Sequence, residues 1–328
     1  MTVFSLRRAV LGLACASAVL LAACGSSTTE SALTPTRIIA FGDAFSVVTP
    51  GASYTVNDTA SGVITTWLGQ FASSYGITAT PVASGGYVYA QGNARISNTT
   101  DAAGSTTTKT VTQQIDAFLA SGVVLGDNDI VTINAGISDL VVEMNAVTAG
   151  TETSDTMLAN ATQYGKDLGA QVRRLVAAGG KHVVVVGPYN MGVSPWAASL
   201  NQSGLLQSAT GKLNDAMLVS IVDLGANVLY LDAAYYFNLV SGTDHANYGV
   251  ANVTGLACSS VDSGAGIGTG TGQVNSSRCT PSTINPVITA NSAGVTYDQY
   301  LFADNLYFTP IAQRLFGLYA YSRVHLRW

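Results

Sequence analysis

The sequence is short of charged residues. Only 10% of its 328 residues are Asp, Glu, Lys or Arg, whereas ordinary soluble domains carry about 25%. With four lysines and a net charge of −5, it has no dense basic face, which argues against a nucleic-acid partner. The 48% of hydrophobic residues argues against a disordered chain, because such chains are rich in charge and poor in apolar residues. The composition indicates a globular protein.

Long hydrophobic runs, histidine and cysteine are also scarce. After residue 23, no run is long and apolar enough to span a bilayer. The three histidines, His182, His245 and His325, lie far apart, and no cysteine and histidine have zinc spacing. We therefore predict neither a metal nor another cofactor. The length suffices for one large domain with a sizeable core.

The N-terminus has the pattern of an export signal. Arg7 and Arg8 precede the apolar run 9–23, which is too short for a membrane span and typical of a signal peptide. The run ends in LAAC, which resembles a bacterial lipobox, whose cysteine (here Cys24) receives a lipid. The alternative is an ordinary signal peptide with an incidental cysteine. Residues 24–35 are predicted to be a flexible tether.

The predicted location follows from these features. A lipid on Cys24 would attach the protein to a membrane of the bacterial cell envelope. Gly25, in place of the Asp that retains lipoproteins at the inner membrane, favours the outer membrane, facing the periplasm or the cell surface.

Two cysteines remain for the folded domain. Cys15 leaves with the signal peptide and Cys24 takes the lipid, so Cys258 and Cys279 are expected to pair in an oxidising compartment. Closing such a loop stabilises a fold by about 3 kcal/mol. The bond would pin residues 241–297, which are rich in Gly, Ser, Thr and Asn and are expected to form a long surface excursion.

Strand and helix patterns alternate along the rest of the chain. Apolar runs predict strands at 37–41, 129–133, 182–186 and 227–231. Helical spacing of apolar residues predicts helices at 63–75, 111–119, 154–178, 205–224 and 309–321. The alternation predicts that residues 36–328 form an α/β domain, a three-layer sandwich whose mainly parallel sheet lies between helices, as in flavodoxin-like folds. Working sites in such folds lie at the carboxyl ends of the strands.

Five segments resemble the sequence blocks of the SGNH/GDSL hydrolases, a family of lipases and esterases. Residues 37–46 read RIIAFGDAFS, where the first family block has F-G-D-S-[LF]-S-D. The other four resemble the later blocks in family order and, with the first, span nearly the whole mature chain: 89–94 (YAQGNA), 136–139 (GISD), 183–195 (VVVVGPYNMGVSP) and 302–309 (FADNLYFT). This resemblance also implies the three-layer SGNH fold.

The resemblance implies positions for a catalytic triad, and this chain has lost most of them. Ala44 stands where the family has its Ser nucleophile, Tyr307 where it has its His base, and Ser138 where it has the Asn of the oxyanion hole. Gly92 and Asp304 are retained, although Asp304 could equally cap the helix near residue 309. Losing the Ser or the His of a serine hydrolase costs about a million-fold in turnover.

Two of three possible functions need no catalysis. In the leading one, the chain is an inactive hydrolase-like lipoprotein whose pocket, including Asp43, Asp139 and Phe308, binds a lipid, an ester or a glycan. Asp43 and Asp139 could instead be turn and cap residues, and Phe308 a core aromatic. In another, the chain is a structural or interaction lipoprotein with a vestigial pocket, and residues 241–297 form its partner surface.

The third possible function is an active ester hydrolase with a relocated nucleophile. Ser46 lies two residues after Ala44, and His245 could reach it if the 241–297 excursion folded over the site. The alternative is that Ser46 shapes a turn and His245 is a solvated loop residue. A filled site under Ala44 would favour the structural protein, an open cleft the binding protein, and Ser46 beside His245 the enzyme.

Overall fold

The computed structural model describes residues 31–290 and 294–328. The predicted signal peptide (1–23), Cys24 and tether residues 24–30 lie outside the described residues. The chain divides into two units, 1–32 and 33–328, and everything below concerns the second. Among the described helices, none has the length and apolar character needed to cross a bilayer.

A parallel four-stranded sheet lies at the centre of this unit. Its strands are β1 (Arg37–Gly42), β2 (Asp129–Asn134), β3 (Val183–Val186) and β4 (Val228–Leu231), arranged side by side in that order. Residues 87–91 cover the outer edge of β1 through a parallel bridge between Ala40 and Val88. Counted with this segment, the order is 2-1-3-4-5, which is that of flavodoxin-like folds. The predicted α/β class is confirmed.

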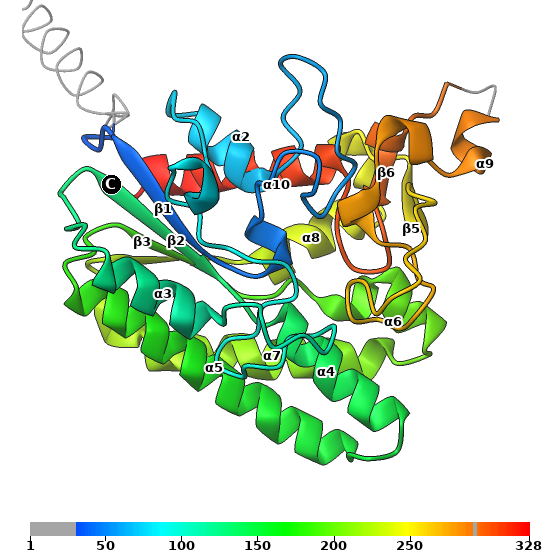
Figure 1. Cartoon of the computed structure of the whole chain (residues 1–328), viewed down its shortest axis with the longest axis horizontal. Helices are drawn as coiled ribbons and strands as arrows, with labels where there is room; N and C mark the ends of the chain where they lie inside the picture. Colours follow the sequence, from blue (N-terminus) through cyan, green and yellow to red (C-terminus); the bar gives the residue numbers. More distant parts are fainter. Residues whose placement is uncertain (1–30, 291–293) are drawn as a thin grey trace, which may run out of the picture. The chain divides into compact units, whose positions relative to one another are not determined.

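Helices cover both faces of the sheet and complete the three predicted layers (Figure 1). One face carries α3 (Val111–Ala120), α4 (Ile137–Thr148), α5 (Ser154–Ala177) and α7 (Ser203–Ser220). The other face carries α2 (Trp67–Ser73), α8 (Ala233–Ser241) and α10 (Pro310–His325). The short helices are α6 (Pro195–Ser199) and α9 (Pro286–Thr289). Glycine lets α5 and α7 approach closely, because a Cβ on Gly165 would lie 2.1 Å from the carbonyl oxygen of Leu213.

Local chemistry explains where the predicted helices differ. The helix expected at 63–75 covers only 67–73, because Thr66 is its N-cap and its hydroxyl accepts a hydrogen bond from the N–H of Gly69 at 3.1 Å. Helix α7 ends at Ser220, and a separate 3-10 turn follows at 222–224. Helix α4, directly after β2, was not predicted.

Residues 241–297 are more than a surface excursion. Strand β5 (Asn252–Leu256) pairs in parallel with β6 (Tyr300–Phe302) in a second, two-stranded sheet. The expected disulfide between Cys258 and Cys279 is present, and a second hydrophobic core surrounds it. Asn57 ties this core to the chain after β1: its N–H donates to Cys279 O at 2.8 Å and its amide to Ser276 O at 3.2 Å. The excursion is therefore folded and partly buried.

Candidate functional site

Two of the expected site residues lie at adjacent strand ends. Ala44 begins a 3-10 turn directly after β1, and Asp43 caps that turn by accepting a hydrogen bond from the N–H of Phe45 at 3.0 Å. Ser138 lies in the first turn of α4, directly after β2. The last residue of β2, Asn134, donates its side-chain N–H to Asp43 at 2.7 Å, which joins the two strand ends. Both Ala44 (2% exposed) and Ser138 (1%) are closed off from solvent.

Asp304 and Tyr307 lie in a tight turn after β6. One carboxylate oxygen of Asp304 accepts hydrogen bonds from the N–H groups of Leu306 (2.9 Å) and Tyr307 (2.7 Å). The other accepts one from the N–H of Ser276 at 2.9 Å, which ties the excursion to this turn. The suggestion that Asp304 caps the last helix is wrong, because Thr309 is the N-cap of α10 and the three donors of Asp304 lie elsewhere. Asp304 shapes the turn that holds Tyr307.

Tyr54 packs against two of the predicted site residues, Gly92 and Tyr307. Its phenol lies so close to Gly92 that a Cβ added there would be 1.7 Å from the phenol oxygen. Its ring packs edge-on against that of Tyr307, with 5.2 Å between the ring centroids. Burial, followed by the nearby carboxylates of Asp304 and Asp43, raises the pKa of Tyr54. Tyr54 lies outside all five resembling segments, so no motif in the sequence marks it as a residue of the site.

Tyr307 could not act as the general base that the family resemblance implies at position 307. It is 1% exposed, and burial, with a further contribution from Asp43, raises its pKa well above the usual value of 10. The phenol is therefore neutral at physiological pH and cannot accept a proton from a nucleophile.

The relocated pair, Ser46 and His245, is not brought together. Ser46 is fully buried, and its hydroxyl has no hydrogen-bond partner in the described part of the chain. His245 lies in a 3-10 turn after α8, with Nδ1 2.6 Å from the carbonyl oxygen of Val250. Ser138 also has a buried hydroxyl without a partner among the described residues. A nucleophile hydrogen-bonded to a base, which serine catalysis needs, is absent from these positions.

Phe308 belongs to the core. It is fully buried and stacks on Phe237 with 3.8 Å between ring centroids, and its ring also contacts Tyr189 at 4.7 Å and Phe302 at 5.2 Å. These contacts favour the alternative that Phe308 is a core aromatic, because its ring is enclosed by other aromatic rings.

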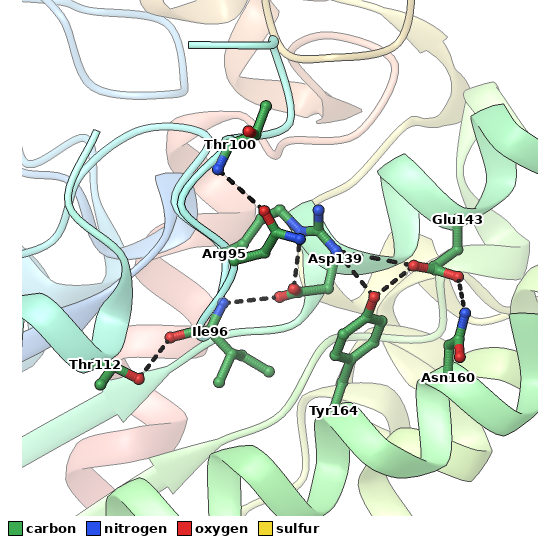
Figure 2. Close-up of polar contacts among 9 residues, drawn as sticks. Arg95, Ile96, Thr100, Thr112, Asp139, Glu143, Asn160 and Tyr164 are labelled. Atoms are coloured by element: carbon green, nitrogen blue, oxygen red, sulfur yellow. Dashed lines mark hydrogen bonds and ion pairs between the residues drawn. The ribbon is translucent and has the colours of Figure 1, made fainter. Parts of the chain in front are cut away.

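Asp139, the other expected pocket carboxylate, lies in a buried ionic cluster between α4 and α5 (Figure 2). Its carboxylate accepts from Arg95 Nε at 3.1 Å and from the N–H of Ile96 at 3.1 Å. Arg95 also lies 3.8 Å from Glu143 and donates to the hydroxyl of Tyr164 at 2.9 Å. Burial outweighs these contacts and raises the pKa of Asp139 to about 6. Each charged member has a partner, which favours a structural role over binding.

Asp43 carries the most perturbed carboxyl of the site. Burial raises its pKa to about 7, although the hydrogen bonds from Phe45 and Asn134 act in the opposite direction. One of its oxygens, Oδ2, has no side-chain or backbone partner that meets hydrogen-bond geometry within the described residues. At neutral pH this group is thus divided between its neutral and charged forms.

The main groove on the described surface lies away from the predicted site residues. A groove of about 580 Å³ is lined by residues between 48 and 79, and none of the predicted site residues lines it. Across residues 31–290 and 294–328, no three His, Cys, Asp or Glu side chains are grouped to hold a metal ion.

No protein-family model matches the chain, and no curated protein sequence matches it.

Proposed function

We propose that this chain is a non-hydrolytic lipoprotein of the cell envelope, built on an SGNH/GDSL-like scaffold, with a structural or interaction role. One observation carries the proposal: Tyr54 lies against Gly92 and Tyr307, in the space that a substrate of such a scaffold would need. A second observation supports the proposal: position 44 is alanine, so no hydroxyl is present where the family resemblance implies the nucleophile.

The closed site favours a structural role over a ligand-binding one. Small-molecule sites are concave and mostly preformed, whereas Ala44, Ser138 and Tyr307 are each at most 2% exposed. A ligand could reach them only after Tyr54 moved, together with the excursion that is held by the Asp304–Ser276 hydrogen bond. The cell-envelope location depends separately on the lipobox resemblance of Cys24, and mass spectrometry of the mature chain for a lipid on that residue tests it.

Hydrolysis of p-nitrophenyl acetate by the chain from Gly25 onward tests the loss of activity. We expect background rates from the native chain and from an Ala44→Ser/Ser138→Asn/Tyr307→His variant, because Tyr54 still fills the site. Adding Tyr54→Ala to this variant is expected to give measurable turnover, whereas Tyr54→Ala alone, the matched control, stays at background. Native activity that disappears with Ser46→Ala would refute the proposal, and turnover by the triple variant alone would show an open pocket.

A further inference from the structure

The most exposed hydrophobic side chains are gathered at one end of the domain. Among the large hydrophobic residues of the described chain, the four most exposed are Val124 (80%), Val222 (79%), Leu326 (75%) and Val219 (74%). Val124 lies in the loop before β2, Val219 and Val222 lie at the end of α7 and in the turn before β4, and Leu326 follows α10. All four therefore lie where the parallel strands begin, at the end opposite the candidate site.

We call this end the amino edge. It comprises the residues that lead into and begin the strands (33–37, 121–129, 178–183 and 221–228), the last five residues of α3, α5, α7 and α10, and 326–328. Direct contacts hold it together: Arg37 donates to Val124 O at 2.9 Å, Lys181 pairs with Asp127 at 2.7 Å, and the rings of His182 and Trp328 are 4.9 Å apart. The C-terminal residue, Trp328, therefore lies next to the start of β3, at this end of the sheet (Figure 1).

The charge of the amino edge is opposite to that of the rest of the domain. Residues 31–328 contain twelve Lys and Arg and eighteen Asp and Glu. Six of the basic residues but only four of the acidic ones lie on the amino edge, which gives it a net charge of +2 against −8 elsewhere. The acidic residues there are all paired with basic ones, whereas Arg323 and Arg327 form no ion pair with any described residue.

The chain enters the domain at this same edge. Residue 33 begins the compact unit, and β1 starts at Arg37. Only eight residues lie between Cys24 and residue 33, and the nine steps from one to the other span at most about 30 Å. A lipid on Cys24 would hold the amino edge closer to the bilayer than any other end of the domain.

We propose that the amino edge is a membrane-contacting face, which inserts Val124, Val222 and Leu326 among lipid headgroups while Arg323 and Arg327 approach anionic phosphates. Apolar area buried at the interface and attraction to anionic lipids add in such binding. The proposal rests on the lipid anchor of the proposed function. It leaves the 241–297 excursion, at the other end of the sheet, facing away from the membrane.

The test mimics the anchor chemically, so that its result does not depend on lipidation in the cell. The thiol of Cys24, in a chain that starts there, is coupled to a maleimide phospholipid in vesicles of phosphatidylcholine and phosphatidylglycerol; Cys258 and Cys279 are already bonded to each other. Hydrogen–deuterium exchange is then compared with that of the uncoupled chain. We expect slower exchange at 121–128 and 221–227 and no change at 259–274. Slowing at 259–274, or at neither place, would overturn the proposal.

Variants separate the side chains of the amino edge from general adhesion. Val124→Ser/Val222→Ser/Leu326→Ser is expected to weaken partition onto these vesicles by at least about tenfold, and added salt is expected to weaken it further. Val261→Ser/Val287→Ser, at exposed apolar positions of the excursion (59% and 69%), is the matched control and is expected to bind like the native chain. Equal partition of the two variants would overturn the proposal. An unlipidated Cys24 in cells would instead refute the anchor alone.

Discussion

Replacing Asp43 by Asn should make the protein more stable, and increasingly so as the pH rises. Burial raises the pKa of Asp43 from the usual 3.8 to about 7. Below about pH 4 the carboxyl is protonated in both the folded and the unfolded chain. Between about pH 4 and pH 7 the unfolded chain releases this proton and the folded chain keeps it, so the free energy of unfolding falls as the pH rises. Three pH units at 1.36 kcal/mol each amount to about 4 kcal/mol, fully lost above pH 7.

An Asn side chain at position 43 does not titrate, so the variant does not lose this free energy as the pH rises, and it can keep the main hydrogen bonds of Asp43. Its amide oxygen can accept the hydrogen bonds from the N–H of Phe45 and the side chain of Asn134 that Asp43 accepts now. Because folded domains are stable by only about 5–15 kcal/mol, a gain of even half the calculated size is readily measured. The difference between variant and native chain reports chiefly on Asp43, because the other carboxyls titrate in both; it includes the repulsion between Asp43 and the carboxylate of Asp139, which also raises the pKa of Asp43.

Urea unfolding, followed by tryptophan fluorescence at a series of pH values from about 4 to 8, measures this difference. We expect the two chains to be similar near pH 4, and the variant to gain steadily up to about pH 7 and then remain level. Asp58→Asn is the control, because the hydroxyl of Tyr297 lowers the pKa of Asp58, so that this variant should lose stability above pH 4. A difference for Asp43→Asn that does not change with pH, or a variant less stable at pH 8, would refute the reasoning.

Two further predictions concern the stability of the fold. Arg95→Met should lower the free energy of unfolding by about 3–5 kcal/mol, because it leaves the buried carboxylate of Asp139 without its counter-charge. Urea titration measures this loss. Arg173→Met, at an exposed ion pair, is the control, and an equally small loss from Arg95→Met would contradict the prediction. Cys258→Ser/Cys279→Ser should lower the free energy of unfolding by about 3 kcal/mol, because the disulfide joins residues 21 positions apart. A melting temperature that does not change when the disulfide of the native chain is reduced would argue against this.

The strands could be predicted from the sequence because burial on both faces leaves a plain signal. The run at 182–186 is nearly all valine, and β3 covers 183–186 with every residue buried. Helix α4 gave no such signal, because Asp139 and Glu143 lie on its buried face, paired with Arg95, and interrupt the apolar spacing on which helix prediction depends.

The candidate site could be predicted only in part, because its closure depends on contacts distant in sequence. Tyr54 meets Tyr307 from a position more than 250 residues earlier, and no local pattern indicates such a contact. The small polar residues of the excursion predict a surface segment, yet Ser276 is fully buried. Its N–H is bonded to Asp304 and its carbonyl to Asn57, and polar groups bonded in this way can be buried at little cost.

Packing alone accounts for the residues at 41–43, within the segment that resembles the first block of the SGNH/GDSL hydrolases. A Cβ on Gly42 would lie 2.1 Å from the side-chain oxygen and 2.7 Å from the carbonyl oxygen of Asn134, so any other residue would push β1 away from β2. The side chain of Gln114 accepts from Gly42 N at 2.8 Å and donates to Gly42 O at 2.9 Å, which closes the end of β1. Asp43 caps the turn that follows. These positions are fixed by the backbone, whereas Ala44 needs only to be small enough for a closed space. A match to this segment therefore predicts the end of a strand and its turn, and the hydroxyl at position 44 must be established separately before an activity is inferred.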